Sequence, residues 1–259
     1  MANKFYDNIV IGSKLTDILT TSVDLKNYMT VDATLTESAG MTKKVNTYKA
    51  SGSVEDLAIG AGNTGEIGVS FESTDYAVLT TQGKFQYFDE QAMSDPMVVD
   101  AGIDGLAKTI INDFSKKAVA AFDNATLTLS AAAWDFDMVV DAIAKLNIEA
   151  EEGYFILINP AEKAELRKNL KDLLSYSEGF ARTGYIGTVA GLPVIVSKAV
   201  PAGTAYVANN EAVTCFLKKD TEIEQDRDAD TRNNIVYARV YEVIALTDAT
   251  KVVKVTKTA

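Results

Sequence analysis

Residues 95–124 have the sequence DPMVVDAGIDGLAKTIINDFSKKAVAAFDN, whose pattern of apolar residues predicts one long helix. Asp95 has the side chain of a helix N-cap, and Pro96 suits the first helical position, where its missing N–H costs nothing. The predicted helix is roughly 40 Å long at ~1.5 Å per residue. Gly102 and Gly105 weaken its first turns, so we expect a neighbouring segment to pack closely there. Apolar residues recur on one face at alternating spacings of four and three: Val99, Ile103, Leu106, Ile110, Phe114, Ala118 and Ala121.

The segment before this helix, residues 42–83, has the alternation of β-strands. Around residues 60–65, GAGNTG, glycines make a flexible tip. We therefore predict a long two-stranded β-hairpin. Because an isolated hairpin is marginal in water, it should lean on something outside its own segment. The alternating apolar positions are Ile67, Val69 and Phe71, then Tyr76, Val78 and Thr80.

The two ends of the chain differ in their patterns of polar and apolar residues. Residues 1–41 are polar and weakly periodic, which predicts an extended arm with at most one short helix. From Trp134 onward, helix and strand patterns alternate, with a buried strand at 154–158 and a helix opened by Asn159-Pro160. Further β runs cover residues 192–197, 205–208, 235–246 and 251–256. The predicted fold class is α+β, with a hairpin and an arm that do not fold back onto the core.

Composition excludes several classes of function. The chain has 259 residues, no histidine, and 25 Lys+Arg against 36 Asp+Glu, which gives a net charge of −11. A sequence pI of 4.6 argues against a protein that binds nucleic acid by neutralising phosphates. Without imidazole there is no Ser-His-Asp or Cys-His system and no histidine metal ligand. The one cysteine, Cys215, excludes an internal disulfide, and no segment is apolar enough for a signal peptide or a membrane span.

Two motifs resemble binding sites but lack their context. Residues 60–65 match GxGxxG, yet a strand follows where a nucleotide site needs a helix N-terminus. Asp226, Asp228 and Asp230 have the spacing of a calcium loop, but Thr231 and Tyr237 stand where glycine and glutamate are required. We predict a hairpin tip and a charged surface turn instead, with no cofactor and no metal.

Other reactive side chains have ordinary explanations. Cys215 lies in the apolar run AVTCFL, which predicts a buried, inert thiol. Neighbouring carboxylates, 89–90 and 151–152, do not face each other on regular elements. Tyr237 and Tyr241 lie on one strand face and suit a core or an interface better than a base-stacking platform. The sequence therefore predicts no catalytic residue.

The order of these elements resembles the major capsid proteins of tailed bacteriophages, with the Hong Kong 97-type coat fold. The resemblance runs from Phe71 to the C-terminus. It is carried by FDEQAMSDPMVVDAGIDGLAKTIINDFSKKAVAAFD, similar to the spine helix and its lead-in, and by YFILINPAEKAELRKNL, similar to a strand-to-helix unit. GYIGTVAGLPVIVSKAVPAGTAYVANNEAV and IVYARVYEVIALTDATKVVKVTK resemble a glycine-bounded loop with its following strands and the closing strands.

The resemblance implies a structural protein, not an enzyme. Hexamers and pentamers of the chain would form an icosahedral shell that encloses double-stranded DNA without sequence-specific binding. It would be part of the virion capsid, assembled in the host cytoplasm, with a separate scaffolding protein, a portal and decoration proteins as partners and no membrane. The implied parts are an N-terminal arm (1–41), an extended loop (42–83), a peripheral domain (84–133) with the spine helix (96–124), and an axial domain (134–259) whose closing strands partly return to the peripheral domain.

Some members of that family crosslink a loop lysine to an asparagine of a neighbour. Residues of the right type are present, but no motif fixes a pair among Lys43, Lys44, Lys49, Asn233 and Asn234. Two alternatives stay open at this point. One is an encapsulin-type compartment, which shares the fold and encloses cargo enzymes. The other is a histidine-free enzyme that uses carboxylates or a bound metal, although no spacing of Asp and Glu points to its site.

Overall fold

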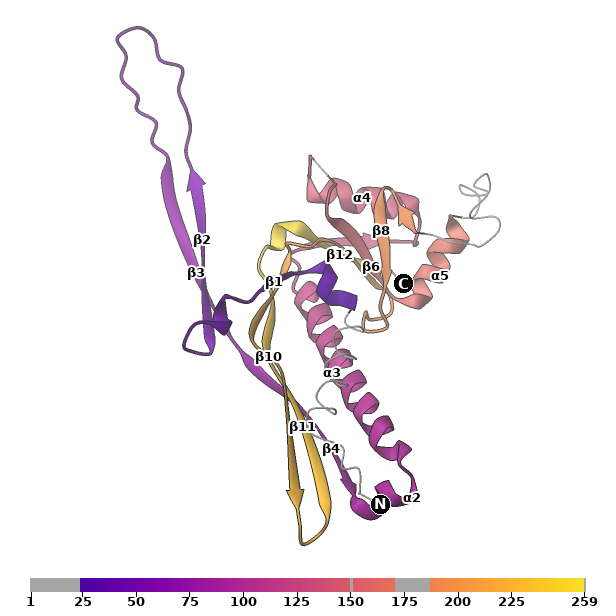
Figure 1. The fold of residues 1–259 in the computed structure, drawn as a ribbon. Coiled ribbons are helices and arrows are strands. Elements are labelled where there is room, and N and C mark those ends of the chain that lie inside the picture. The colour runs from indigo at the N-terminus through magenta and orange to yellow at the C-terminus, as the bar shows by residue number, and fades with distance from the viewer. Residues whose placement is uncertain (1–23, 150, 171–186, 259) are drawn as a thin grey trace.

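A computed structural model describes residues 24–149, 151–170 and 187–258 of the chain. It is an elongated α+β structure, in which a long hairpin projects from one side of a body made of two sheets and one long helix (Figure 1). Among the described residues, no helix is both long enough and apolar enough to cross a membrane.

The predicted long helix is α3, Met97–Asp123, and its predicted apolar face is buried. The helix begins one residue later than predicted, so Pro96 is the N-cap and not the first helical residue. Asp95 still caps the first turn, because its Oδ1 accepts a hydrogen bond from the Met97 backbone nitrogen at 3.0 Å. A short helix, α2 (Asp89–Ser94), leads into α3.

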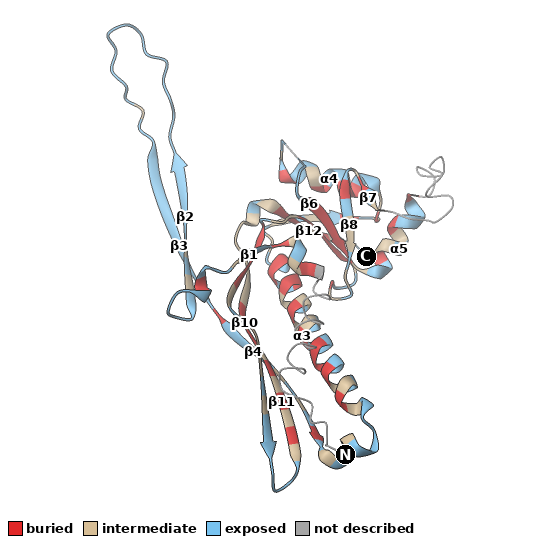
Figure 2. Cartoon of the chain, viewed as in Figure 1, coloured by how far each residue is buried: buried red, intermediate tan, exposed pale blue. Residues whose placement is uncertain are grey.

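A four-stranded sheet packs against α3, in the order β1-β10-β11-β4. Its strands are β1 (Thr30–Asp32), β10 (Val213–Asp228), β11 (Asn233–Leu246) and β4 (Leu79–Phe88). Ile103, Leu106 and Ile110 of the helix form one buried cluster with Val236 and Ala238 of β11. Helix and sheet thus share a core that runs along the lower part of the molecule in Figure 2.

Gly102 explains how closely the helix approaches this sheet. A Cβ atom at Gly102 would overlap the ring of Phe85 on β4, and one at Gly83 of β4 would overlap Leu106. The expected close neighbour is therefore present at Gly102. At Gly105 the expectation is wrong, because that position is exposed and an added Cβ meets no atom within 4 Å.

A six-stranded sheet forms the second part of the body, in the order β5-β12-β9-β6-β8-β7. Helices α4 (Phe136–Leu146) and α5 (Pro160–Asn169) accompany it, and Trp134, Ile156 and Leu166 are fully buried between sheet and helices. The strands are β5 (Leu127–Ala131), β6 (Tyr154–Ile158), β7 (Thr188–Val189), β8 (Leu192–Val196), β9 (Thr204–Asn209) and β12 (Val252–Lys257), which follows the 3-10 helix η3 (Ala249–Lys251).

The described part of the predicted arm is packed, which corrects the expectation of a free extended segment. Residues 1–23 lie outside the described residues. From there, η1 (Asp24–Tyr28), β1 and η2 (Thr34–Thr36) lie against the body. Leu25, Met29 and Leu35 are 3–6% exposed, because they fill gaps between α3, β10 and the hairpin root. Apolar residues spaced this widely produce no period, so their burial could not be predicted from the pattern.

The hairpin also ends earlier than predicted. Strands β2 (Thr42–Ser51) and β3 (Gly68–Ala77) pair antiparallel, from Thr42↔Ala77 to Ser51↔Gly68. Residues 79–83 belong instead to β4, which pairs with β11. The period of two continues through this change of partner, so the pattern alone placed both strands in one hairpin.

One further boundary differs from the expected one. Strand β5 lies before residue 134 but pairs in parallel with β12 of the six-stranded sheet. Of the two closing strands, β11 joins the four-stranded sheet with β4, whereas β12 stays in the six-stranded sheet. The resembling run that begins at residue 184 starts in the 171–186 segment, which lies outside the described residues.

Candidate functional site

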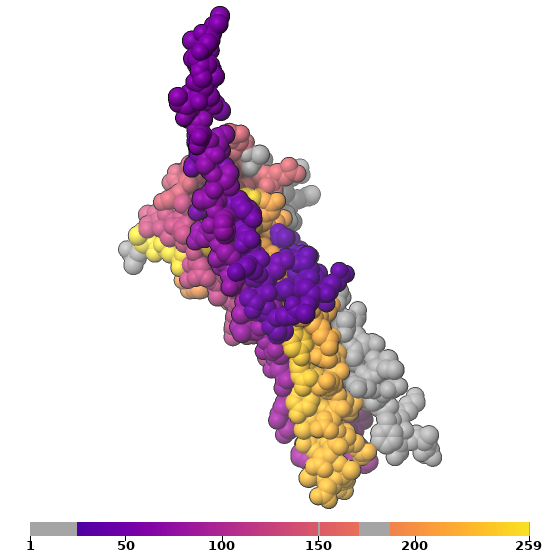
Figure 3. Space-filling model, turned by 90° about the vertical axis from the view of Figure 1, so that its left-hand side faces the viewer, coloured from indigo at the N-terminus to yellow at the C-terminus, as the bar shows by residue number. Residues whose placement is uncertain are grey.

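The extended hairpin is the most exposed feature of the described chain. Its hydrogen-bonded ladder stops at Ser51 and Gly68, and residues 52–67 continue outward without pairing to each other. In Figure 3 this end stands clear of the rest of the molecule. Large apolar side chains on it lie in solvent: Tyr48, Val54, Leu57, Ile59, Ile67, Val69 and Phe71 are 50–109% exposed. Such exposure marks an interaction surface, since each of these side chains would gain roughly 1.5–3 kcal/mol on full burial.

Polar contacts organise the tip of the hairpin. The Glu55 carboxylate accepts hydrogen bonds from the backbone nitrogen of Thr64 at 3.1 Å and from its hydroxyl at 2.8 Å. These bonds hold the pKa of Glu55 below its ordinary value. Gly65 donates its N–H to Asn63 Oδ1 at 3.1 Å. The GxGxxG match therefore lies in a hairpin tip, and the next regular element is strand β3, so the expected absence of a helix end after it is confirmed.

The root of the hairpin is fixed to the body. Tyr76 of β3 stacks on Phe216 of β10, with ring centroids 5.2 Å apart. The Tyr76 hydroxyl donates to the Leu246 carbonyl at 3.4 Å. Lys43 pairs with Asp32 at 3.1 Å, which ties β2 to β1. The root of the hairpin and the body are thus joined by ring stacking, a hydrogen bond and an ion pair.

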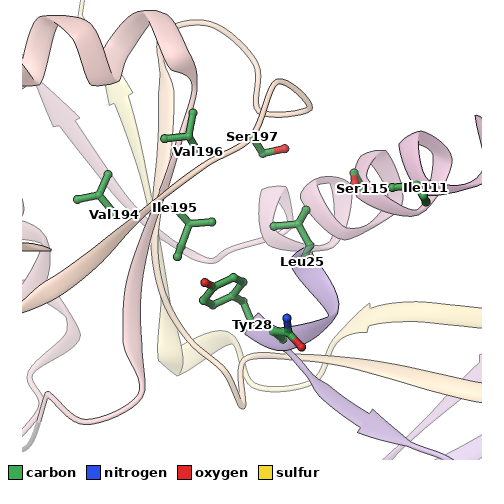
Figure 4. A pocket seen from close by; sticks show the side chains of 9 residues that line it. Leu25, Tyr28, Ile111, Ser115, Val194, Ile195, Val196 and Ser197 are labelled. Atoms are coloured by element: carbon green, nitrogen blue, oxygen red, sulfur yellow. The ribbon is translucent and has the colours of Figure 1, made fainter. Parts of the chain in front are cut away.

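Several cavities open on the described part of the chain. One of about 410 Å³ lies where η1 and α3 meet β8, with Leu25, Tyr28 and Ile195 around it (Figure 4). None of its lining residues carries a carboxylate, an amine or a thiol. Also among the described residues, no group of three or more His, Cys, Asp or Glu side chains could hold a metal ion.

The aspartates flagged as a calcium-like triplet are only partly in a turn. Asp226 and Asp228 lie on β10, and the turn follows them. Asp228 accepts hydrogen bonds from the Thr231 hydroxyl at 2.7 Å and the Asp230 backbone nitrogen at 3.0 Å, which keep its pKa low. Its carboxylate therefore closes a β-turn, and the prediction of a turn is right only for the residues after Asp228.

The remaining candidates have structural roles. Cys215 is fully buried on β10, and burial raises the pKa of its thiol to about 12. Asp89 is held by Arg227 at 2.8 Å and by Asn234 Nδ2 at 2.6 Å, which lower its pKa. Tyr237 lies under the guanidinium of Arg239, on the outward face of β11.

The residues considered for crosslinking are engaged within the chain. Lys44 lies 3.8 Å from Asp75, and Lys49 lies 3.7 Å from Glu72, both across the hairpin ladder. Asn234 is 5% exposed and holds Asp89 through its amide nitrogen, as described above.

One residue that the sequence analysis missed is Glu242. Residues of even number from 234 to 242 form the buried face of β11, and Glu242 is 5% exposed at its end. The signal was present in the sequence, because the alternation of VYARVYEVIAL places a glutamate on the same face as Val236, Ala238 and Val240. A charged side chain on a buried apolar face is unusual, because such residues are rarely buried without a partner.

Several solved structures have the same fold as this chain. The capsid of Cyanophage P-SCSP1u has a TM-score of 0.70 at 13% identity, and 89% of this chain and 86% of that one are covered. Mycobacterium phage Che8 gives 0.70 at 19% identity, covering 90% and 91%. A virus-like particle from Pyrococcus furiosus gives 0.67 at 13% identity, covering 94% and 96%. The fold is that of shell subunits from tailed-phage capsids and a related particle.

Sequence comparison then gives the family. The model of the phage capsid protein family matches residues 71–255, and the chain belongs to this family. A relative, the major capsid protein of Staphylococcus phage phiMR11, is 30% identical over 176 residues, which are 65% of this chain and 64% of the relative's length. By its family, the chain is a phage capsid protein.

Proposed function

We propose that copies of this chain form hexamers and pentamers of an icosahedral shell of the Hong Kong 97 type, which encloses double-stranded DNA. The observation that carries the proposal is the hairpin, whose exposed apolar side chains have no core of their own. A second copy is the natural source of their burial, because head-to-tail contacts repeat from subunit to subunit and close into rings.

The parts of the molecule suit this role. Residues 42–77 would be the extended loop, and α3 with the four-stranded sheet would be the peripheral domain around the spine helix. The six-stranded sheet with α4 and α5 would be the axial domain, and residues 1–41 the N-terminal arm. We place the assembled shell in the virion, built in the host cytoplasm with a scaffolding protein, a portal and decoration proteins.

The acidic balance of the chain supports enclosure of DNA without binding it. With a net charge of −11, a wall of these subunits repels phosphate instead of holding it at many sites. The virus-like particle from Pyrococcus furiosus shares the fold, so the fold alone does not distinguish a capsid from another compartment. The family match and the Staphylococcus phage relative favour the capsid.

Shortening the hairpin tests the proposal. Ser51 and Gly68 are the last paired residues, so replacing residues 52–67 by Asn-Gly closes the ladder with a two-residue turn. The variant should fold with unchanged circular dichroism and thermal midpoint but form no shells in electron micrographs. The matched control replaces only Gly60-Ala61 by Asn-Gly and keeps the apolar side chains; it should assemble. Shells of normal size from the shortened variant would overturn the intersubunit role.

A further inference from the structure

Glu242 lies on β11, on the face of the four-stranded sheet that packs against α3. On β11 it is opposite Leu217 of β10 and Leu79 of β4. Leu79 is only two residues beyond Ala77, where the hairpin ends. Leu25 of η1 and Phe114 of α3 belong to the buried cluster that also contains Cys215, the residue in contact with Glu242. Leu25 and Phe114 thus place η1 and the long helix beside the contact between Cys215 and Glu242.

The two described lysines nearest Glu242, Lys26 and Lys117, contact other groups. Lys117 of α3 pairs with Asp113 at 2.7 Å and contacts the Thr81 hydroxyl. Lys26 of η1 lies over the ring of Phe114, 5.9 Å from its centroid. Among the described residues, neither of these lysines nor any other cation lies within the 4 Å of an ion pair with the Glu242 carboxylate.

The contacts of the carboxyl group itself are weak ones. Cys215 Sγ of β10 is 3.8 Å from Glu242 Oε2, a contact in which the thiol is the donor. The facing residues of β4, from Leu79 to Thr81, carry no charge. Charging a buried carboxyl without an ion-pair partner is costly, so such a group tends to stay protonated. Burial is accordingly the main cause that raises the pKa of Glu242; Asp113 raises it further, while Lys26, Lys117 and the Cys215 contact oppose the rise.

We propose that Glu242 is a pH-sensitive joint: when protonated it allows η1, α3 and the sheet to pack together, and when ionised it loosens η1 from that junction. Of the elements beside the carboxyl, η1 is the shortest. It is five residues long, and its continuation β1 pairs with β10 over only Thr30, Val31 and Asp32. Short segments with few buried contacts open at the lowest cost. The inference concerns the single subunit and does not depend on shell formation.

The direction of the effect follows from proton linkage. In the closed state Glu242 has a raised pKa, and in the open state it regains its ordinary value near 4.5. Opening therefore releases a proton, and rising pH favours the open state. Between the ordinary and the raised pKa, the opening constant increases by at most about tenfold per pH unit, and above the raised pKa it is level. The junction is tight in acid and loose at higher pH.

Hydrogen exchange of the full-length chain tests this joint. Protection of peptides that cover residues 24–32, corrected for intrinsic exchange rates, is measured from pH 5 to pH 8. In the wild type it should fall severalfold or more as the pH rises and then level off. Glu242→Gln should keep the high protection at every pH. The control Glu72→Gln removes a carboxylate with 74% side-chain exposure on β3 and should follow the wild type.

A second variant keeps the test decisive if Glu242→Gln does not fold. Lys26→Met removes a cation that lowers the pKa of Glu242, so the wild-type transition should move to higher pH. A wild-type profile that does not change with pH would overturn the proposal. So would the same profile in Glu242→Gln as in the wild type, or a shift to lower pH in Lys26→Met.

Discussion

Tyr76 on the hairpin and Phe216 on β10 stack with 24° between their ring planes and 5.2 Å between centroids. Phe216 is 2% exposed, and Leu35 and Val78 complete the same cluster. This pair joins the hairpin, which has no hydrophobic core of its own, to the four-stranded sheet. This attachment favours contacts between subunits, because a loosely attached hairpin would lose more conformational entropy on docking against a second copy.

Removing the buried ring at this join should destabilise the subunit. We expect Phe216→Ala to lower the free energy of unfolding by about 3–5 kcal/mol, the usual cost of deleting a buried phenylalanine. Urea denaturation followed by circular dichroism measures it. Phe71→Ala is the control, since Phe71 is 69% exposed on the hairpin and its loss should change stability by less than about 0.5 kcal/mol. Equal effects of the two changes would contradict the burial described here.

The two glycines of α3 should respond in opposite directions to alanine. Gly105→Ala should raise the free energy of unfolding by up to about 1 kcal/mol, because the position is exposed and alanine favours helix. Gly102→Ala should lower it despite the same helical gain, because the new methyl group overlaps the Phe85 ring. Thermal unfolding compares the pair, and adding Phe85→Leu to Gly102→Ala should restore part of the loss. Stabilisation by Gly102→Ala alone would show that the helix and β4 are less closely packed.

The thiol of Cys215 should report unfolding. It is fully buried and its pKa is raised to about 12, so the native chain should not react with a thiol reagent at pH 8. In urea, reaction should appear with the same midpoint as the loss of circular dichroism. Rapid reaction of the folded chain would place Cys215 at the surface and would contradict this core.

Assembly should depend on salt because every subunit carries a net charge of −11. Raising the ionic strength shortens the Debye length from ~30 Å at 0.01 M to ~8 Å at 0.15 M and so reduces repulsion between copies. Light scattering across this range should increase with salt at fixed protein concentration. Scattering that decreases with added salt would show that attraction between opposite charges dominates the contacts.

The sequence predicted the elements whose pattern is local and missed those defined by a partner. The apolar row of α3 has one period over the whole helix, so its position was predictable to within one residue. Strand β10 was recognised only at its apolar start, because its second half, KKDTEIEQDRD, is charged. Among the described residues, this second half of β10 pairs with β11 on one side and forms an edge of the sheet on the other. Charged side chains are expected on such an edge because they discourage pairing with a further strand.

The sequence likewise predicted part of the candidate site, namely the hairpin and its tip, but not the contacts at the hairpin root. Alternation and glycines indicated the hairpin and its tip, but the change of partner after Ala77 leaves no mark on the period of two. The stacking of Tyr76 on Phe216 joins residues 140 positions apart by their numbering, and no local pattern pairs them. Glu242 could have been noticed as a charge on an apolar face, whereas its neighbours Lys26 and Lys117 come from distant elements.

Electron microscopy of the purified full-length chain, with sedimentation at low and moderate salt, shows whether copies of the chain assemble through the hairpin. We expect closed shells or rings of five and six subunits, more abundant at moderate salt. A uniform monomer at every salt and protein concentration would contradict assembly of this chain through its own hairpin.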